Sequence, residues 1–381
     1  MYSIFDYGEM LASDARVSAY VRALGQLVRP ETVVLEIGTG TGFFAMMACQ
    51  FGARKVYAIE PDDVIQLARE TAAANGFADR IEFIQDLSTQ VTPPEQADII
   101  ISDIRGRLPL FQRLIPTIID ARHRLLALGG TLIPRRDTMW VAVVDAPQLY
   151  NSFTDPWYTT GQHYGLDLSA SIRLSLNTWN KGRVTPDQFV VEPACWATLE
   201  YHTIDSPDVQ GGATWTVSRD RDAHGLSIWF DAETAEGIKF SNAPGEPELV
   251  YRSAFFPWLE PVSLIAGDLI SMVFNADLVD TEYVWRWDTR ICDRRGNVKA
   301  NFKQSTFFGS AFSPQRLRRI AGNYLPRLNE TGVIDQLILS LMDGATPQDD
   351  IARQVLERFP AHFEDRQAAL TRISQLSLKY T

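Results

Sequence analysis

Between Val33 and Val144 the chain alternates short β-branched runs with segments of helical length, and this alternation restricts the fold more than any other feature. The runs are apolar on both faces, which is typical of strands in a parallel sheet that helices cover on both sides. We expect helices over 42–51 and 62–75, and strands at VVLEI, KVYAIE, IEFIQ, DIIIS and TLIP. The pattern predicts a doubly wound α/β domain.

The chain beyond Asp145 has a different pattern, because helical periodicity fades and strand-like runs dominate. Turn-forming residues at 211–212, 242–245 and 295–297 punctuate these runs, as expected of antiparallel strands. The expected strands are QFVVEP, CWATLEYHTI, ATWTVS, LSIWFDA, LISMVFNADL and EYVWRWDTRI. A separate all-β domain, either a sandwich or a barrel, is the simplest interpretation.

The last part of the chain returns to helical patterns. Residues 314–323, 333–342 and 368–378 show the apolar spacing of helices, and DGATPQDDIARQVLERF adds a turn, a cap region and a further helix. From Ser313 to Thr381 nine Lys and Arg residues stand against eight Asp and Glu residues, a net charge of +1. This balance does not predict a basic nucleic-acid clamp.

The whole chain is acidic, with 36 Lys and Arg against 47 Asp and Glu among 381 residues. A net charge of −11 disfavours a protein that binds nucleic-acid phosphates without sequence preference. The apolar runs fall far short of the roughly 20 residues that cross a bilayer. The N-terminus shows no secretion or import signal. We therefore expect a cytoplasmic protein with neither membrane nor nucleic acid as a partner.

The metal-ligating residue types are scattered. The three cysteines, Cys49, Cys195 and Cys292, lack metal-ligand spacing, and we expect buried thiols in a reducing compartment. The five histidines are equally dispersed, so no metal site is expected. His163 and His202 are candidates for a catalytic base, with a structural role as the simpler interpretation.

The strongest local signal is the run VVLEIGTGTG over 33–42, in which a buried strand leads directly into a glycine-rich turn and a helix. Gly38 and Gly40 allow the backbone to turn tightly and to approach a ligand closely. Glu60 ends the second strand eighteen residues after Gly42, where a carboxylate can accept hydrogen bonds from both ribose hydroxyls. Together these features predict a cofactor that contains adenosine.

The spacing of the glycines narrows the choice of cofactor, because GxGxG is not the dinucleotide pattern GxGxxG. The run E-I-G-T-G-T-G resembles the first motif of class I S-adenosylmethionine-dependent methyltransferases. The resemblance implies that Glu36 acts near the methionine ammonium group and that Gly38 and Gly40 pack under the cofactor. It also implies that Glu60 binds the ribose.

Asp86 and Leu87 follow the third expected strand, IEFIQ. In the methyltransferases that the chain resembles, this position often contacts the adenine amino group, and the resemblance implies the same role here. An ordinary turn or cap carboxylate is the alternative interpretation of Asp86.

Three further segments resemble the protein arginine methyltransferases more specifically. Residues 9–11, Glu-Met-Leu, followed by Arg16 and Tyr20, resemble the N-terminal helix of that family, whose arginine meets the cofactor carboxylate. The resemblance assigns that contact to Arg16. Residues 98–103 match the fourth strand and the start of the active-site loop, and residues 121–134 resemble the next helix and strand.

The resemblance covers about residues 5 to 290 and implies a seven-stranded Rossmann-like domain followed by an antiparallel β-barrel. The expected domains are an N-terminal helical segment that covers the cofactor (1–30), a Rossmann-like domain (31–145), a β-barrel domain (146–312) and a helical C-terminal domain (313–381).

Two segments point to partners. The family inserts a dimerisation arm that corresponds here to about 150–180, where Trp157 and Tyr158 are candidates for a homodimer contact. The C-terminal domain resembles the small winged-helix modules that bind leader peptides in bacterial peptide-modifying enzymes. A plain structural extension is the simpler alternative for it.

The active-site loop departs from the family pattern, in which two glutamates hold the guanidinium of the substrate. Here the first position is Asp103 and the second is Gln112, which carries no charge. A desolvated planar cation needs anionic partners on its donors, so one amide removes half of the charge compensation. Arg105 and Arg107 add positive charge to the same loop. Both departures argue against peptidyl-arginine as the substrate.

A second departure lies in the β-domain, where the family places a Thr-His-Trp loop. The best alignment places Leu249-Val250-Tyr251 there, and an alternative match places Asn301-Phe302-Lys303-Gln304 there. Neither segment contains a histidine. The surroundings of the reacting groups are therefore expected to differ from those of the family.

Candidate catalytic roles follow from the chemistry of methyl transfer, which needs an aligned nucleophile and a proton acceptor. Asp103 is the candidate for orienting or deprotonating the acceptor, and Gln112 for hydrogen-bonding it. Arg105 or Arg107 could hold an acceptor carboxylate or phosphate, with a solvated loop face as the alternative. Tyr7 near the N-terminal helix is a further polar candidate.

Three functions remain open. The first is an S-adenosylmethionine-dependent methyltransferase that acts on a nitrogen or oxygen of a small molecule or peptide, in biosynthesis. The second keeps arginine or another guanidino compound as the acceptor. The third is a catalytically inactive, cofactor-binding regulatory protein.

Overall fold

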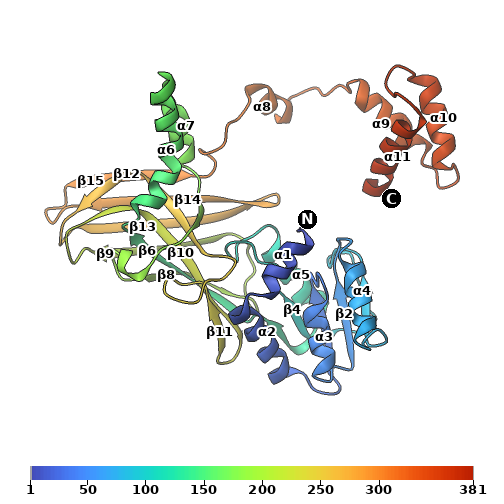
Figure 1. Ribbon diagram of the computed structural model, residues 1–381, viewed down its shortest axis with the longest axis horizontal. Coiled ribbons are helices and arrows are strands. Elements are labelled where there is room, and N and C mark those ends of the chain that lie inside the picture. The colour runs from blue at the N-terminus through green and yellow to red at the C-terminus, as the bar shows by residue number, and fades with distance from the viewer. Residues whose placement is uncertain (1, 381) are drawn as a thin grey trace. The chain divides into compact units, whose positions relative to one another are not determined.

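The computed structural model describes residues 2–380 (Figure 1). The chain forms two compact units, one that extends to Ala311 and one that begins at Phe312. No helix in the described part of the chain is long and apolar enough to cross a membrane.

The first unit begins with alternating helices and strands. Helix α1 starts with a capping box in which Ser3 and Asp6 satisfy each other's backbone N–H groups. The bounds of this part are α1 Ile4–Leu11, α2 Asp14–Leu27, β1 Val33–Ile37, α3 Phe43–Gln50, β2 Lys55–Ile59, α4 Ile65–Ala74, β3 Ile81–Ile84, β4 Ala97–Ser102, α5 Leu114–Arg124 and β5 Leu126–Ile133.

The strands of this part form a parallel sheet in the order β3-β2-β1-β4-β5, which confirms the expected Rossmann-like α/β class. The sheet has five strands rather than the expected seven. Strand β6 (Arg136–Val144), which directly follows β5, does not extend this sheet and pairs antiparallel with β8 and β10 in a second sheet. The segment up to residue 145 therefore contributes to both sheets.

The strand order predicts a ligand crevice at one edge of the parallel sheet. Strand β1 lies between β2 and β4, with Glu36 aligned to Ala58 on one side and Ile101 on the other. The chain leaves β1 toward β2 and later returns to β4 on the opposite side, which is the arrangement that opens a ligand crevice beyond the carboxyl ends of the strands. The glycine-rich turn and Glu60 lie at this edge.

The second part of this unit consists of antiparallel sheets and a helical arm. One sheet has the order β7-β12-β10-β6-β8 with β11 paired to β10, and the other has the order β15-β14-β13-β9. The bounds are α6 Pro147–Tyr164, α7 Ser169–Ser175, β7 Asn180–Gly182, the 3-10 turn Pro186–Gln188, β8 Ala194–Glu200, β9 Val209–Thr216, β10 Arg221–Ala235, β11 Ile238–Ser241, β12 Ser253–Leu264, β13 Leu269–Val279, β14 Glu282–Cys292 and β15 Val298–Ser305.

Aromatic side chains pack between the two antiparallel sheets. Phe256 packs edge-to-face against Phe274 at 4.9 Å and against Trp287 at 5.2 Å, measured between ring centroids. Trp258 and Trp287 are fully buried. Such side chains each remove a large apolar area from water, so they account for much of the stability of this part.

Several sequence expectations for this part differ from the structure. An arm was expected at about 150–180, but its two helices, α6 and α7, were not predicted, because Pro156 and Gly161 inside α6 interrupt the helical pattern. Gly211, expected in a turn, lies inside β9, where a Cβ atom would be only 1.7 Å from the Trp196 carbonyl oxygen. Residues 188–193 contribute one isolated bridge, at Phe189, rather than a strand.

The second unit is helical and has a core of its own. Its helices are α8 Pro314–Ile320, α9 Glu330–Leu341, α10 Gln348–Arg358 and α11 Arg366–Tyr380. Asn329 caps α9 by accepting a hydrogen bond from the Gly332 N–H. The core side chains are Ile334, Ile338, Ile351, Ala352, Val355, Ala369, Ile373 and Leu376.

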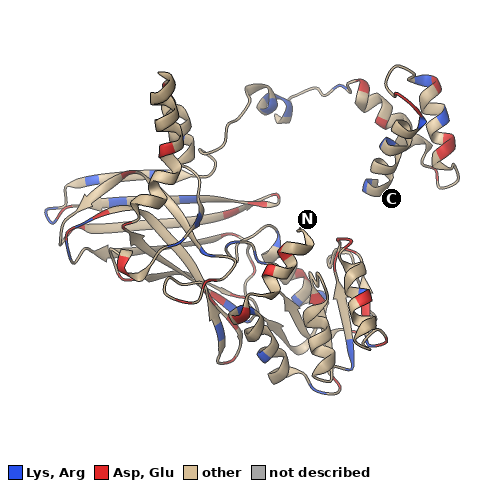
Figure 2. Cartoon of the chain, viewed as in Figure 1, with Lys and Arg blue, Asp and Glu red and all other residues tan. Residues whose placement is uncertain are grey.

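Acidic and basic residues are interspersed along the chain (Figure 2). Within residues 2–380 no group of three or more His, Cys, Asp or Glu side chains is placed to hold a metal ion.

Candidate functional site

The glycine-rich turn connects β1 to α3 and is held against β2. The N–H groups of Gly38 and Thr39 both donate to the Ile59 carbonyl oxygen, at 2.9 and 3.0 Å. Gly38 and Gly40 have φ angles of +75° and +52°, a region that residues with a Cβ atom rarely adopt. A Cβ atom on Gly40 would lie 2.8 Å from Cε1 of Tyr7. The turn therefore requires glycine for both its conformation and its contacts.

Glu60 follows β2 and faces the glycine turn. Its carboxylate accepts hydrogen bonds from the Gly40 N–H at 3.0 Å and from the Asp62 N–H at 3.1 Å. Burial raises the pKa of this carboxyl, partly offset by these two N–H donors. Two carboxylate oxygens can accept more than two hydrogen bonds, so capacity remains for a ligand diol.

Glu36, on β1, is buried and forms no ion pair with any residue that the structure describes. The Thr39 hydroxyl donates to its carboxylate at 2.6 Å, and the Ala45 backbone N–H is a second neutral donor. Burial raises the pKa of Glu36 to about 8. A buried carboxyl group of this kind is well suited to a ligand ammonium group, because the cation would supply the missing charge compensation.

Helix α1 covers the glycine turn. Tyr7 lies against Gly40, and burial together with the charges of Glu60 and Asp62 raises the pKa of Tyr7 to about 12. Asp86 and Leu87 follow β3 at the same edge of the sheet, and both are exposed. The Leu87 N–H donates to the Asp86 carboxylate at 2.6 Å. The described residues thus surround the crevice from α1, β1, β2 and β3.

Arg16 and Asp103 form an ion pair. Arg16 is buried on α2, and one of its terminal nitrogens donates to the Asp103 carboxylate while the other donates to the Met10 carbonyl oxygen. The Tyr20 hydroxyl donates to the second oxygen of Asp103 at 3.0 Å. The structure therefore joins a predicted cofactor-binding residue to a predicted catalytic residue.

One further donor of Arg16, the buried Nε–H group, has no protein partner within the described part of the chain. A buried guanidinium with an unused donor beside the crevice suits a ligand carboxylate. Together with Glu36, Gly40 and Glu60, this arrangement fits an S-adenosyl amino acid, which carries an ammonium group, a carboxylate and a ribose.

Arg105 does not face an open site. Its guanidinium donates to both oxygens of Asp137, at 2.9 and 2.8 Å, and lies over the rings of Phe230 and Phe240 at 5.4 and 5.5 Å. The Tyr201 hydroxyl also donates to Asp137. The Arg105 side chain is only 2% exposed, so it lies in the wall beneath the loop rather than at its surface.

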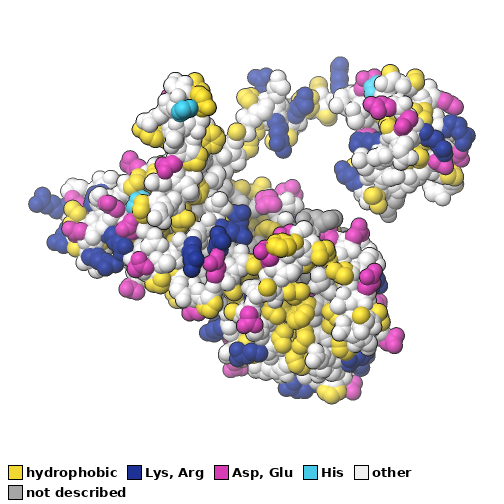
Figure 3. Space-filling model, viewed as in Figure 1, with side chains coloured by type: hydrophobic (Ala, Val, Ile, Leu, Met, Phe, Trp, Pro, Cys, Tyr) yellow, Lys and Arg dark blue, Asp and Glu magenta, His cyan; other side chains and the backbone are white. Residues whose placement is uncertain are grey.

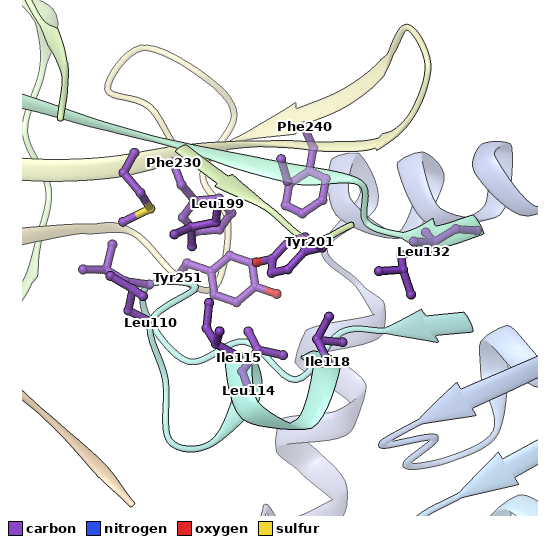
Figure 4. Packing of buried hydrophobic residues seen from close by; sticks show 14 of the residues in the cluster. Leu110, Leu114, Ile115, Ile118, Leu132, Leu199, Tyr201, Phe230, Phe240 and Tyr251 are labelled. Atoms are coloured by element: carbon purple, nitrogen blue, oxygen red, sulfur yellow. The ribbon is translucent and has the colours of Figure 1, made fainter. Parts of the chain in front are cut away.

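The wall beneath the loop is otherwise apolar. Figure 4 shows Tyr201 and Tyr251 between the α5 side chains, such as Leu114 and Ile118, and Phe230. Burial raises the pKa of Tyr251 to about 12. The loop after β4 thus rests on a packed junction between the parallel sheet and the antiparallel sheets.

Sequence reasoning missed Asp137, Tyr201 and the role of Tyr20. The sequence contains a signal for Asp137, since it is a charged residue at the start of the apolar run DTMWVAVV. In the structure Asp137 is fully buried. Its partner could not be identified from local patterns, since Arg105 lies 32 residues earlier in the chain.

The far end of the loop is exposed. Gln112 has a φ angle of +43°, which is uncommon for a residue other than glycine. Its neighbour Arg113 donates to the Asp280 carbonyl oxygen at 3.3 Å. Arg107 donates to Asn180 Oδ1 at 2.8 Å.

The candidate histidines have other contacts. His202 Nε2 accepts the Leu132 N–H at 3.3 Å, and burial lowers the pKa of His202. His163 lies near the end of α6, edge-to-face against Tyr164. On the same helix Trp157 and Tyr158 are 41% and 58% exposed.

Comparison with known proteins gives the family. The family described as Ribosomal protein L11 methyltransferase (PrmA) matches residues 18–133. Protein arginine N-methyltransferase PRMT10 of Oryza sativa subsp. japonica is 30% identical over 325 residues, covering 74% of this chain and 85% of the relative. Protein arginine N-methyltransferase 1 of Dictyostelium discoideum is 26% identical over 279 residues, covering 71% and 81%.

Solved structures show the same fold. Protein arginine methyltransferase 10 of Arabidopsis thaliana superposes with a TM-score of 0.70 at 23% identity, covering 80% of this chain and 97% of that chain. A Trypanosoma brucei PRMT1 enzyme-prozyme heterotetrameric complex with AdoHcy gives a TM-score of 0.72 at 24% identity, covering 78% and 96%. The chain therefore belongs to the protein arginine N-methyltransferase family and is an S-adenosylmethionine-dependent methyltransferase.

Proposed function

We propose that this enzyme transfers a methyl group to a nitrogen or oxygen of a small molecule or peptide, and that peptidyl-arginine is not its substrate. The proposal rests on the residues at the two loop positions where the family has glutamates. The Asp103 carboxylate is already paired with Arg16, and Gln112 supplies no charge. A guanidinium at this loop would therefore lack the two carboxylates that could compensate it.

The proposed cofactor site consists of residues around the crevice. Glu36 would hold the methionine ammonium group, Arg16 the carboxylate, and Glu60 the ribose, over the backbone of Gly38 and Gly40. Asp86 and Leu87 would adjoin the adenine. When bound, S-adenosylmethionine supplies an electrophilic methyl group.

The proposed catalytic roles belong to the loop. Asp103 would orient the acceptor and take up its proton, with Arg16 and Tyr20 fixing the direction of its carboxylate. Gln112 would hydrogen-bond the acceptor through its amide. For Arg105 we propose a positioning role, since its contacts with Asp137 hold the loop from below.

Radiolabelled methyl transfer tests the proposal. The protein is incubated with labelled S-adenosylmethionine and a cell extract separated by size, and cofactor binding is measured in parallel by calorimetry. We expect cofactor binding and label in the fraction of low molecular mass or of short peptides, and loss of that label with Asp103→Asn. Label confined to arginine in large proteins would contradict the proposal. Binding without any transfer would instead indicate a cofactor-binding regulator.

A second candidate function is methylation of arginine or another guanidino compound. The names of the relatives favour it, since they are protein arginine N-methyltransferases. One carboxylate, Asp103, is available to contact a guanidinium if its pair with Arg16 opens. Amino-acid analysis of the labelled product distinguishes this candidate, because methylated arginine would appear in the hydrolysate.

The arm formed by α6 and α7 is the proposed homodimer contact. Trp157 and Tyr158 expose aromatic surface that a second copy of the chain could cover. Sedimentation of the wild type and of Trp157→Ala tests this, and a monomeric wild type at micromolar concentration would contradict it.

A further inference from the structure

Three basic side chains converge beside the loop after β4, and we call Arg107, Lys181 and Arg252 the basic cluster. Arg107 lies in that loop, between Asp103 and Gln112. Lys181 is on β7, and Arg252 directly precedes β12, the strand that pairs with β7. All three side chains belong to exposed residues.

Each member of the cluster is held in place by neighbouring groups. Arg107 donates to Asn180 Oδ1 at 2.8 Å, and its guanidinium lies 5.8 Å from the ring centroid of Trp179. Lys181 Nζ donates to the Val250 carbonyl oxygen at 3.0 Å. These contacts reduce the freedom of two long side chains before any ligand binds, which lowers the entropic cost of binding.

The backbone at Arg252 is strained. Its φ angle is +51°, a left-handed conformation that costs free energy for a residue with a Cβ atom. Gln112, in the loop that carries Arg107, has the same kind of strain, with φ at +43°. Strained backbone positions of this kind concentrate at binding and catalytic sites, where the surrounding structure maintains them.

The cations of the cluster are close enough to act on one another. Burial, followed by the charges of Arg107 and Arg252, lowers the pKa of Lys181, while Glu9 raises it. Like charges this close repel, and an anion placed between them would remove that repulsion. The contacts of Arg107 with Asn180, next to Lys181, and of Lys181 with Val250, two residues before Arg252, place the three residues around one region.

The surrounding charges leave the region positive. Glu248 accepts a hydrogen bond from Arg252 Nε at 2.8 Å and lies 3.5 Å from Arg183. With Arg183 counted, four cations face two carboxylates, Glu248 and Glu9, so a surplus of two positive charges remains. Figure 3 shows Lys and Arg side chains gathered where the antiparallel sheets meet the α/β part.

The position of the cluster relates it to the reaction. Glu9 acts on Lys181 from α1, the helix that covers the glycine turn through Tyr7. Arg107 approaches from the loop that begins with Asp103. The cluster therefore adjoins the loop that carries the proposed acceptor-binding residues, Asp103 and Gln112.

We propose that the methyl acceptor carries a carboxylate or phosphate group and that the basic cluster binds this group. The inference rests on the proposed function and specifies its substrate class. Two guanidinium groups offer forked donors that match the oxygens of such anions, and Lys181 adds a point charge. The anion would anchor the acceptor while its nitrogen or oxygen faces Asp103.

A small anion suits the site better than a polyanion. The cluster contains three cations over a limited area, while the whole chain carries a net charge of −11. Polyanions such as nucleic acids need several phosphate contacts along an extended basic surface. The proposed ligand is therefore a single anionic group on a small molecule or at a peptide end.

Calorimetric titration with inorganic pyrophosphate tests the site directly. The full-length protein is saturated with S-adenosylhomocysteine, and the probe is titrated into the wild type, Arg107→Gln and Lys181→Gln. We expect binding with a Kd of about 1 mM or tighter, and at least about tenfold weaker binding in both variants. Arg286→Gln and Lys303→Gln, which remove exposed cations from β14 and β15, serve as matched controls and should bind like the wild type.

Binding of the cofactor product to every variant, measured in the same instrument, shows that the variants are folded. Two results would overturn the inference. One is equal affinity of the wild type and both cluster variants for pyrophosphate, and the other is no binding to the wild type at roughly 10 mM pyrophosphate, 10 times the expected Kd.

A second measurement separates the inference from the proposed function. The labelled methyl products from the extract are passed over an anion exchanger. We expect the main labelled product to be retained. The KM for the corresponding acceptor should rise at least about tenfold in Arg107→Gln with little change in kcat, because the anchoring contact is made equally in the ground state and in the transition state. A neutral or cationic main product would refute the inference and leave the proposed function standing. Absence of any transfer would refute the proposed function, and the pyrophosphate titration would then decide on the site alone.

Discussion

One terminal nitrogen of the Arg105 guanidinium donates to both carboxylate oxygens of Asp137, at 2.9 and 2.8 Å, and the two side chains are 2% and 0% exposed. The pair joins the loop after β4 to the first strand of the antiparallel part. Because both charges are removed from water, each is tolerated only while the other is present.

Removal of one charge of this pair should therefore destabilise the protein strongly. We expect Arg105→Met to lower the free energy of unfolding of the first unit by about 3–5 kcal/mol, since Asp137 would be left buried and unpaired. Urea denaturation measures the loss. The double variant Arg105→Met with Asp137→Asn removes both charges and should recover most of it. A double variant as unstable as the single one would show that the ion pair is not the cause.

Glu36 should make stability depend on pH. Its pKa is raised from 4.5 to about 8 in the folded protein, so the folded state holds a proton that the unfolded chain releases between these values. The free energy of unfolding of the cofactor-free protein should therefore fall as pH rises from 4.5 to 8, by at most about 1.4 kcal/mol per pH unit from this group.

The control for this prediction is Glu36→Gln, in which the same slope should be smaller. A cation beside Glu36 favours the ionised carboxylate, so saturating S-adenosylmethionine should also flatten the slope of the wild type. Identical slopes in the wild type and Glu36→Gln would refute the assignment.

Gly40→Ala should weaken cofactor binding beyond its effect on stability. Gly76 provides a matched control, because it also has a positive φ, +73°, but a Cβ atom there would meet nothing within 4 Å. Both substitutions should lower the free energy of unfolding by about 1–2 kcal/mol, because a residue with a Cβ atom is strained in the left-handed conformation. Only Gly40→Ala should displace Tyr7 and lower the affinity for S-adenosylmethionine by at least about tenfold, measured by calorimetry. Equal affinities for the two variants would count against a role of this turn in binding.

Gln112→Glu should raise transfer to arginine peptides. The substitution restores a negative charge at the second loop position, and it keeps the same backbone preference at φ +43° because only the amide becomes a carboxylate. We expect an increase of at least about tenfold in kcat/KM for an arginine-containing peptide. Gln50→Glu, at the end of α3, adds the same charge elsewhere and should change nothing. If neither variant gains activity, the missing charge is not what prevents arginine methylation.

The two units should unfold separately, because their apolar cores share no residue. Ile338 and Ile270 are both fully buried, one in each core. Scanning calorimetry should show two transitions, of which Ile338→Ala moves only that of the helical unit and Ile270→Ala only the other. Each substitution should cost about 2–5 kcal/mol. One common transition that both variants shift would contradict this independence.

The sequence by itself determined the class of the fold and was sufficient to predict the residues of the proposed cofactor site. Glu36, Gly38 and Gly40 lie in one continuous strand-turn-helix segment, and Glu60 ends the next strand, so local patterns place them together. The apolar periodicity likewise predicted the parallel strands and the C-terminal helices, since both depend on neighbours close in the chain.

Only the tertiary structure decided which charges meet. The partner of Arg16 is Asp103, 87 residues away, and Arg105 turns inward to Asp137 rather than outward to a substrate. The sheet to which β6 belongs was decided in the same way, because β6 pairs with β8 and β10 in the antiparallel sheet. Such pairings depend on which loops and strand edges the folded chain brings together, and local sequence patterns carry no information about contacts between distant segments.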